Sequence, residues 1–300
     1  GNEVAWMPPA SAGVGSQADI QQLFADLADF MRRLDPTREV SCDGDGDLGG
    51  RLPICSLHYP GPAAPDVKGK LLTIGESGQM FYSEPRLCAY RLGDRVYLSN
   101  NDRLEAVGLE MADNIEGYRR WAAYATPFNI QWYGLEPLPL DVRLTYDRLD
   151  TPGVKPERIG PYSTGLNAGR DPKLPDFIPN PVYKHVADAF VPLRFFVVER
   201  GSSAYVPCRF VRHLAVHNDT MEEKAVEIRW TLAAGRQTVA RDAAKLRLAA
   251  GAWKEIEMRL LLPDLAMPTA TRSVIELLDG GRPAYTDRRT YYLYPRPPVV

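Results

Sequence analysis

The feature that most constrains this chain is a change in hydrophobic periodicity part-way along it. In the first 135 residues, short apolar runs alternate with helical patterns. After Tyr183, segments such as Ala225–Leu232 and Ser273–Leu278 alternate or nearly alternate, and turn signals such as Ala234-Gly235 separate them. Strands interspersed with helices are typical of a parallel sheet, whereas closely spaced strands without helices are typical of an antiparallel sandwich. The sequence therefore predicts an α/β part followed by an all-β part.

The first part contains signals for two helices and several strands. Apolar positions from Ile20 to Leu34 follow helical spacing, and Ser16 with Asp19 resembles a capping box before them. Asp35-Pro36 ends this helix, because the residue before proline is pushed out of the α region. A second helix is predicted between Leu104 and Ala122, and strands are predicted at Ile54–Leu57, Leu71–Ile74 and Phe128–Trp132.

Residues 136–182 are rich in Pro, Gly and Asp and show no sustained period. Such a stretch is long for a loop inside a compact domain, so we interpret it as a connection between domains. The predicted organisation is therefore an α/β domain over residues 1–135, a Pro/Gly-rich connection over 136–182, and a β-sandwich domain over 183–300.

Composition excludes several classes of protein. Lys and Arg number 36 against 38 Asp and Glu, so a net charge of -2 offers no field for a polyanion, and no nucleic-acid partner is expected. No apolar run reaches the ~20 residues of a membrane span. The first residues lack the basic and apolar regions of a signal peptide. The compartment stays open, including a periplasmic or secreted one. The four cysteines have no C-x-x-C spacing and predict buried thiols.

Polar residues close each predicted strand of the first part. Loops at the carboxyl ends of parallel strands gather at one edge of the sheet, where function usually lies. Two of these residues, Glu3 and Glu76, are carboxylic acids at the ends of different strands. Flanked by Asn, His, Tyr and Trp, such a pair suits acid/base chemistry on a neutral polyhydroxylated substrate.

These residues and their neighbours resemble the motifs of a known family. Taken in order, they resemble the catalytic half of the glycoside hydrolase family 2 barrel, which belongs to the retaining clan A: Asn2-Glu3, Asp35-Pro-Thr-Arg38, His58-Tyr59, Gly75-Glu76 and Trp132. The resemblance covers most of residues 1–135. It implies the C-terminal half of a (β/α)8 TIM barrel, from the end of strand four to strand eight. The all-β part is similar to the Ig-like sandwich domains appended in that family.

The resemblance also implies a retaining β-glycosidase, with β-galactosidases among its relatives, and no cofactor. Glu3 corresponds to the general acid/base and Glu76 to the nucleophile, which in retaining enzymes stand ~5–5.5 Å apart. The substrate is a carbohydrate, but the sequence does not specify its sugar.

Four further positions take substrate-binding roles from the same resemblance. Asn2 would bond the sugar 2-hydroxyl, and His58 would line the sugar site. Tyr59 would hold the nucleophile ionised and oriented. Trp132 would supply an apolar floor, or it would be an aromatic of the barrel core.

Three further points bear on this interpretation. Asp43–Asp47 is similar to a calcium loop, but Leu48 and Ile54 stand where Gly and Glu are needed, so we expect a substrate-facing loop after strand five and no metal. The chain begins at the acid/base motif, so the first strands of the barrel are expected to be missing and the isolated chain to have little activity. The other function class is a non-catalytic carbohydrate-binding or assembly module.

Overall fold

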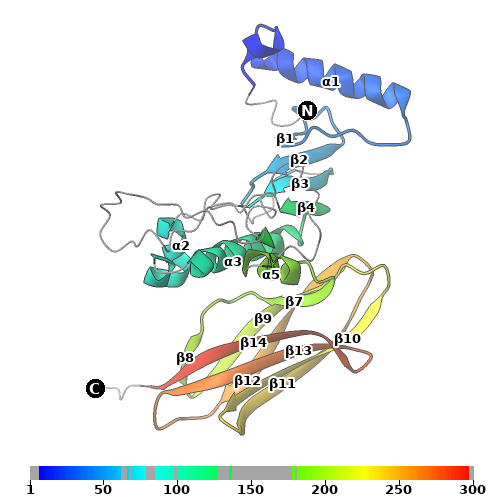
Figure 1. The fold of residues 1–300 in the computed structure, drawn as a ribbon. Coiled ribbons are helices and arrows are strands. Elements are labelled where there is room, and N and C mark those ends of the chain that lie inside the picture. The colour runs from blue at the N-terminus through cyan, green and yellow to red at the C-terminus, as the bar shows by residue number, and fades with distance from the viewer. Residues whose placement is uncertain are drawn as a thin grey trace, which may run out of the picture. The chain divides into compact units, whose positions relative to one another are not determined.

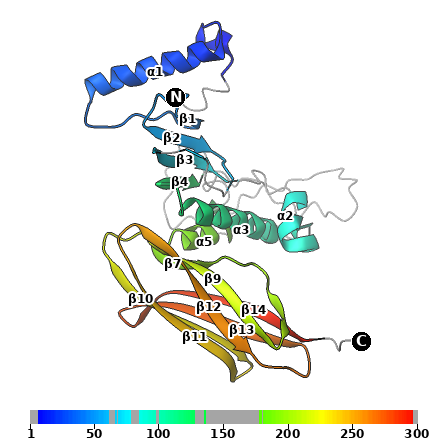
Figure 2. The same cartoon turned by 180° about the vertical axis from the view of Figure 1, so that it is seen from behind.

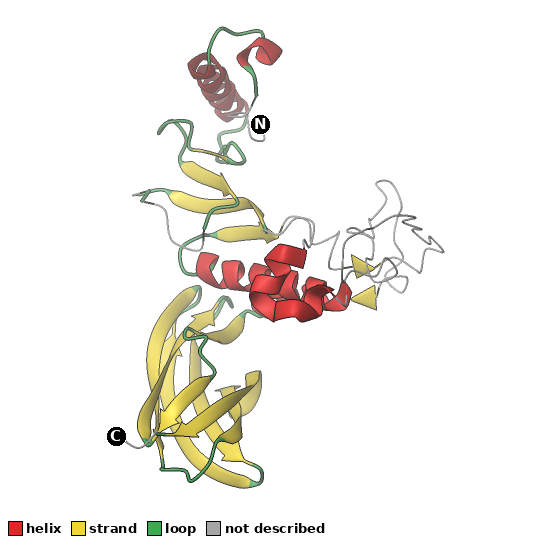
Figure 3. Cartoon of the chain, turned by 90° about the vertical axis from the view of Figure 1, so that its left-hand side faces the viewer, coloured by secondary structure: helices red, strands yellow, loops and turns green. Residues whose placement is uncertain are grey.

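The structure is a computed structural model that describes residues 7–61, 66–67, 69–78, 85–97, 100–127, 135–136, 178–179 and 181–296. The chain divides into two compact units, Gly1–Phe190 and Val191–Val300. All helices among the described residues lie in the first unit, and the second is built of strands (Figure 3). None of these helices is long and apolar enough to cross a membrane.

The first unit mixes helices with short strands. Its helical elements are η2 (Pro9–Ala12), α1 (Gln17–Leu34), α2 (Pro85–Leu92), η3 (Gly93–Tyr97), α3 (Asn100–Tyr118) and α5 (Pro181–Ala189). Its strands are β1 (Asp45–Gly46), β2 (Ile54–His58), β3 (Leu71–Ser77), β4 (Tyr124–Pro127), β5 (Leu135–Glu136) and β6 (Ile178–Pro179).

Helix α1 forms where the sequence predicts it. The Ser16 hydroxyl accepts the Asp19 backbone N–H at 3.3 Å, which satisfies one of the free donors of the first turn. Asp35, extended at φ -135°, ends the helix. Ile20 is fully buried on this helix, but five apolar side chains remain 46–70% exposed: Leu23, Leu27, Phe30, Met31 and Leu34. Periodicity therefore predicted the helix correctly without predicting what covers its apolar face.

A four-stranded sheet with the order β1-β2-β3-β4 lies at the centre of the first unit (Figures 1 and 2). β2, β3 and β4 run parallel, whereas β1 pairs with β2 in antiparallel orientation. β4 occupies residues 124–127, directly before the predicted strand at Phe128–Trp132, which lies outside the described residues. The described strands form an open mixed sheet, and they do not establish half of a TIM barrel.

Helices α3 and α5 lie side by side in the first unit (Figure 1). Val107, Met111 and Ile115 of α3 share a buried cluster with Val182 and Val186 of α5. Helix α5 occupies the start of the region that the sequence predicted as β-sandwich. The first strand of the second unit begins only at Leu193, ten residues after Tyr183.

The second unit consists of two sheets. One has the strand order β12-β9-β7 and the other β11-β10-β13-β14-β8, with antiparallel pairing throughout except between β8 and β14. The strands are β7 (Leu193–Val197), β8 (Ser203–Val206), β9 (Cys208–Asn218), β10 (Lys224–Ala234), β11 (Gln237–Leu248), β12 (Ala252–Leu262), β13 (Thr269–Asp279) and β14 (Arg282–Pro295). The alternating segments Ala225–Leu232 and Ser273–Leu278 lie within β10 and β13.

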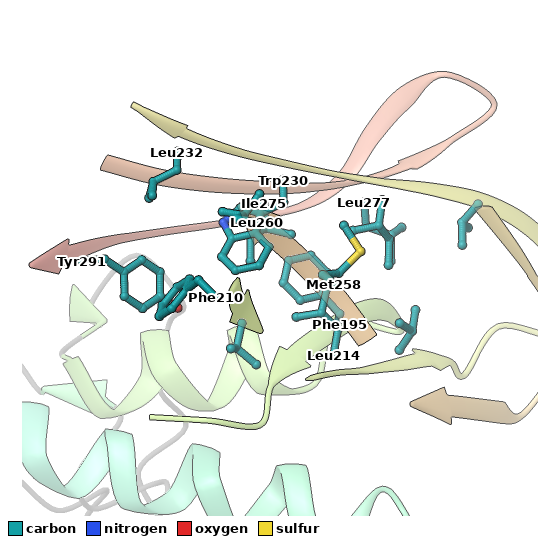
Figure 4. Packing of buried hydrophobic residues seen from close by; sticks show 14 of the residues in the cluster. Phe195, Phe210, Leu214, Trp230, Leu232, Met258, Leu260, Ile275, Leu277 and Tyr291 are labelled. Carbon is teal, nitrogen blue, oxygen red and sulfur yellow. The ribbon is translucent and has the colours of Figure 1, made fainter. Parts of the chain in front are cut away.

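Inward side chains of both sheets form one core (Figure 4). Trp230 of β10, fully buried, donates its indole N–H to the Ser273 hydroxyl at 2.9 Å. Phe210 of β9 lies against Tyr291 of β14 with ring centroids 5.0 Å apart. Because residues alternate along a strand, the positions between these core residues point outward.

Candidate functional site

The candidate site lies at the carboxyl ends of β2 and β3. These strands are adjacent and parallel, so their last residues meet at the same edge of the sheet. The register places His58 opposite Glu76, with a bulge that leaves Gly75 as the extra residue of β3. Bulges often redirect a side chain beside an active site. Two of the residues selected from the sequence are thereby neighbours across the sheet.

Tyr59 holds Glu76 at two points. Its phenol donates to Glu76 Oε2 at 2.6 Å, and its backbone N–H donates to the Glu76 carbonyl at 2.8 Å. Tyr59 adopts φ +46°, a left-handed conformation that costs a non-glycine residue about 1 kcal/mol or more. The two hydrogen bonds hold the residue in this conformation. The carboxylate of Glu76, only 16% exposed, is therefore fixed in orientation by a charge-assisted hydrogen bond.

His58 lies between two carboxylates. Its Nδ1 is 3.5 Å from Glu76 Oε2, and its Nε2 is 3.4 Å from Asp43 Oδ1. The imidazole is 4% exposed, so its contacts are mainly with the protein. Ser56, fully buried, donates its hydroxyl to the same Asp43 oxygen at 2.9 Å. A polar chain therefore runs from Ser56 through Asp43 and His58 to Glu76.

Two glycines make this close packing possible. A Cβ on Gly75 would lie 1.6 Å from Asp43 Oδ1, and a Cβ on Gly44 would lie 2.7 Å from the His58 ring. Gly44 also has φ +82°, which favours glycine. Any side chain at either position would push Asp43 or His58 out of place.

Contacts from the rest of the unit fix the loops around the site. Lys70 donates to Asp47 at 2.5 Å and to the Leu52 carbonyl at 2.8 Å, which anchors the loop that follows Asp43. The hydrogen bond from Lys70, against some burial, lowers the pKa of Asp47. Tyr118 of α3 donates to the Pro60 carbonyl at 2.6 Å, just beyond Tyr59. Burial, with the nearby charge of Glu110, raises the pKa of Tyr118 to about 12, so its hydroxyl stays a donor.

The site residues predicted from the sequence fall into two sets. His58, Tyr59 and Glu76 come together as neighbours. Asn2, Glu3 and Trp132 lie outside the described residues. No group of three or more potential metal ligands occurs among the side chains that the structure describes.

The sequence predicted Asp43 only as part of a substrate-facing loop and did not predict a role for Ser56. Asp43 reaches the site through the turn before β1, and Ser56 points to it from β2. The available signal was the glycine next to each partner, Gly44 beside Asp43 and Gly75 beside Glu76, since glycines often mark close approach.

Comparison with known proteins gives distant similarities only. No family model and no curated protein matches the chain. A β-glucuronidase from glycoside hydrolase family 2 is 11% identical with a TM-score of 0.24, covering 33% of this chain and 11% of its own. A putative β-galactosidase from Bacteroides fragilis is 14% identical with a TM-score of 0.24, covering 34% and 16%. An alkylpurine DNA glycosylase from Pseudomonas fluorescens, bound to DNA with an abasic site analogue, is 12% identical with a TM-score of 0.26, covering 34% and 30%.

These alignments span less than a third of each neighbour's length and mix unrelated activities. Glycoside hydrolase family 2 proteins are thus among the structural neighbours, but the similarity is too distant to assign a function. The residues of the site are therefore the basis for proposing a function.

Proposed function

We propose that this chain carries the nucleophile of a retaining β-glycosidase, and that Glu76 is that nucleophile. The observation that supports this most is the 2.6 Å hydrogen bond from Tyr59 to Glu76 at the ends of adjacent parallel strands. A nucleophilic carboxylate must be ionised and aimed, and a phenol donor on one oxygen leaves the other free to attack. The order of motifs that resembles family 2 agrees with this role.

In the proposed reaction, Glu76 attacks the anomeric carbon and forms a glycosyl ester, while Glu3 protonates the departing glycosidic oxygen. Glu3 then removes a proton from water, whose oxygen attacks the same carbon and releases Glu76. Asn2 and Trp132 would bind the sugar, as the resemblance implies. His58, which is buried between two carboxylates, would position Glu76 and line the base of the site.

The stretch from β3 to β4 supports the proposed barrel, whereas no helix occurs among the described residues between β2 and β3. β2, β3 and β4 are neighbours in chain order and parallel, with α3 between β3 and β4. In a barrel each outer helix packs between neighbouring helices. The exposed apolar side chains of α1 form the kind of surface that such packing covers.

Covalent trapping tests Glu76 without requiring turnover. The full 300-residue chain is incubated with 2,4-dinitrophenyl 2-deoxy-2-fluoro-β-glycosides of galactose, mannose and glucuronic acid. Dinitrophenolate leaves without protonation, so the first displacement does not depend on Glu3. We expect one of the three sugars to form an ester at Glu76, detected by peptide mass spectrometry, and Glu76→Gln to abolish it.

The matched control is Glu105→Gln, which removes a glutamate of α3 that pairs with His185 at 2.7 Å. This variant should label as the unmodified chain does. Labelling at Glu105 or another carboxylate, or no ester with any of the three sugars in a folded chain, would refute the assignment of Glu76.

A further inference from the structure

The small net charge of the chain conceals an uneven distribution. Residues 191–300, the second unit, contain 17 Lys and Arg against 12 Asp and Glu, a net charge of +5. The first unit accordingly carries the compensating negative charge. A local excess of one sign creates a local potential even when the whole molecule is nearly neutral. The second unit can therefore attract anions that the total charge of -2 would not predict.

The positive charge gathers on the outer face of the five-stranded sheet. Ile228, Trp230 and Ile275 point into the core, so the alternate positions of the same strands point outward. The outward residues of β11, β10, β13 and β14 include six cations and two acids. We call this surface the basic face: Arg241, Lys245, Arg247, Glu227, Arg229, Arg272, Glu276 and Arg288.

Both acids of the basic face lie next to a cation of the same face. Glu227 pairs with Arg229 at 2.7 Å, and Glu276 also faces Arg229 across the β10–β13 pairing. By contrast, three exposed guanidinium groups form no ion pair with the part of the chain that the structure describes: Arg241, Arg272 and Arg288. The three guanidinium groups are therefore available to pair with an anion from outside the chain.

The register fixes the spacing of these three arginines. Arg241 lies opposite Thr231, which lies opposite Val274, which in turn lies opposite Arg288. Three inter-strand steps separate Arg241 from Arg288, about 14 Å. Arg272 is a diagonal neighbour of Arg288, about 7–8 Å away. The cations therefore form a sparse array separated by neutral side chains.

One end of the basic face, away from the three unpaired arginines, carries a hollow. It has a volume of about 540 Å³ and is lined by Lys245 and Arg247, by Glu227, and by Leu278 with the Gly280-Gly281 turn. At the other end of the face, Tyr292 of β14 is 48% exposed and presents an aromatic ring. Charged groups, an apolar floor and an aromatic ring together suit a polymer with rings as well as charges.

We propose that the basic face binds an acidic polysaccharide whose carboxylate or sulfate groups recur along an extended chain. Guanidinium groups match these anions with two parallel hydrogen bonds. Duplex DNA fits less well, because it carries about one charge per 1.7 Å and its grooves admit a helix or a two-stranded ribbon, whereas this face is a broad sheet. The choice of a sugar polymer rests on the proposed function, but the anion-binding face does not.

Binding of polygalacturonate to the full chain tests the proposal, with fully methyl-esterified polygalacturonate as the neutral ligand of the same backbone. Heparin tests whether sulfate groups are bound, and a 20-base-pair DNA duplex tests whether nucleic acid is bound. We expect binding to polygalacturonate or heparin at low salt, and none to the ester. Changing all three unpaired arginines to glutamine (Arg241→Gln, Arg272→Gln, Arg288→Gln) should weaken binding at least about tenfold.

A control triple variant removes the same charge elsewhere in the second unit: Arg209→Gln, Arg236→Gln and Lys254→Gln. It should bind within about twofold of the unmodified chain. The arginine variant should also reduce the slope of log K against log salt by about 2, if each lost contact releases ~0.7 ion.

Equal weakening in the two triple variants, or equal binding to the neutral ester, would overturn the assignment of the face. So would failure of the unmodified chain to bind polygalacturonate and heparin. Tighter binding to the duplex than to either polysaccharide would replace the sugar polymer by nucleic acid. Covalent labelling of Glu76 should be unchanged in the arginine variant, so failure of the anion-binding face and failure of the Glu76 assignment can be told apart.

Discussion

Replacing Gly75 by alanine should open the candidate site without altering the rest of the chain. The new methyl group would lie 1.6 Å from Asp43 Oδ1, so the carboxylate must move away. Gly75 does not have a positive φ, and alanine is therefore compatible with its backbone. Moving Asp43 leaves the fully buried Ser56 hydroxyl without its acceptor, which costs about 2 kcal/mol. Asp43 is 44% exposed, so its contact with His58 adds little.

Hydrogen exchange of the Tyr59 amide measures this effect locally. That N–H is bonded to the Glu76 carbonyl at 2.8 Å and exchanges when the site opens. A loss of about 2 kcal/mol corresponds to exchange ~30-fold faster. Gly61→Ala is the matched control, because a Cβ there meets nothing within 4 Å. Peptides from the second unit should exchange unchanged in both variants.

A double-mutant cycle separates the clash from other effects of the substitution. Asp43→Ala removes the obstructing carboxylate and by itself deprives Ser56 of its acceptor. Adding Gly75→Ala to that variant should then cost almost nothing, which gives a coupling energy of about 2 kcal/mol. Additive effects of the two substitutions, or exchange in Gly75→Ala no faster than in Gly61→Ala, would refute the packing described for this site.

Three further outcomes follow from other contacts. Tyr59→Phe removes a hydrogen bond to a charged acceptor, so labelling of Glu76 should slow by about 10- to 100-fold, measured by mass spectrometry over time. Trp230→Ala should destabilise the second unit by about 3–5 kcal/mol in urea, and Ser273→Ala by about 1–3 kcal/mol, because the indole N–H loses its partner. Burial raises the pKa of Cys42 to about 11, and the hydrogen bond that the thiol makes to Asp45, together with the negative charge of Asp45, acts in the same direction. The protonated Cys42 thiol should therefore contribute fully to the free energy of unfolding below pH ~9, and this contribution should be lost as the pH rises to ~11. The free energy of unfolding of Cys42→Ala should not show this loss.

Local signals in the sequence predicted some elements closely. The capping residue Ser16 and the Asp35-Pro36 stop bound α1 because both act within one helical turn. The sequence did not predict β4, since Tyr-Ala-Thr-Pro is a short and weakly apolar segment, and the strand predicted at Phe128–Trp132 lies outside the described residues. α5 escaped notice because its nine residues follow a long stretch without a period. Short elements such as β4 and α5 have weak signals in their own sequence and form because they pack against neighbouring elements.

The candidate site was predictable only in part. The pairing of Tyr59 with Glu76 was expected from the order of motifs, and the two do form a hydrogen bond. The position of Asp43 beside Gly75 depends on the antiparallel pairing of β1 with β2 and on the bulge in β3. Gly44 and Gly75 mark a close approach in the sequence, but not which residue approaches, because that depends on pairings such as Asp45 with Leu57 and His58 with Glu76.

Ionic strength should separate the two proposed functions. The hydrogen bond between Tyr59 and Glu76 is partly buried, so dissolved ions screen it little. The arginines of the basic face are exposed, and at physiological salt the Debye length of about 8 Å is close to the spacing between Arg272 and Arg288. Neighbouring cations then attract a polyanion almost independently. If both proposals hold, binding to the basic face should fall steeply as salt rises, because bound ions are exchanged there, while covalent labelling of Glu76 should change little.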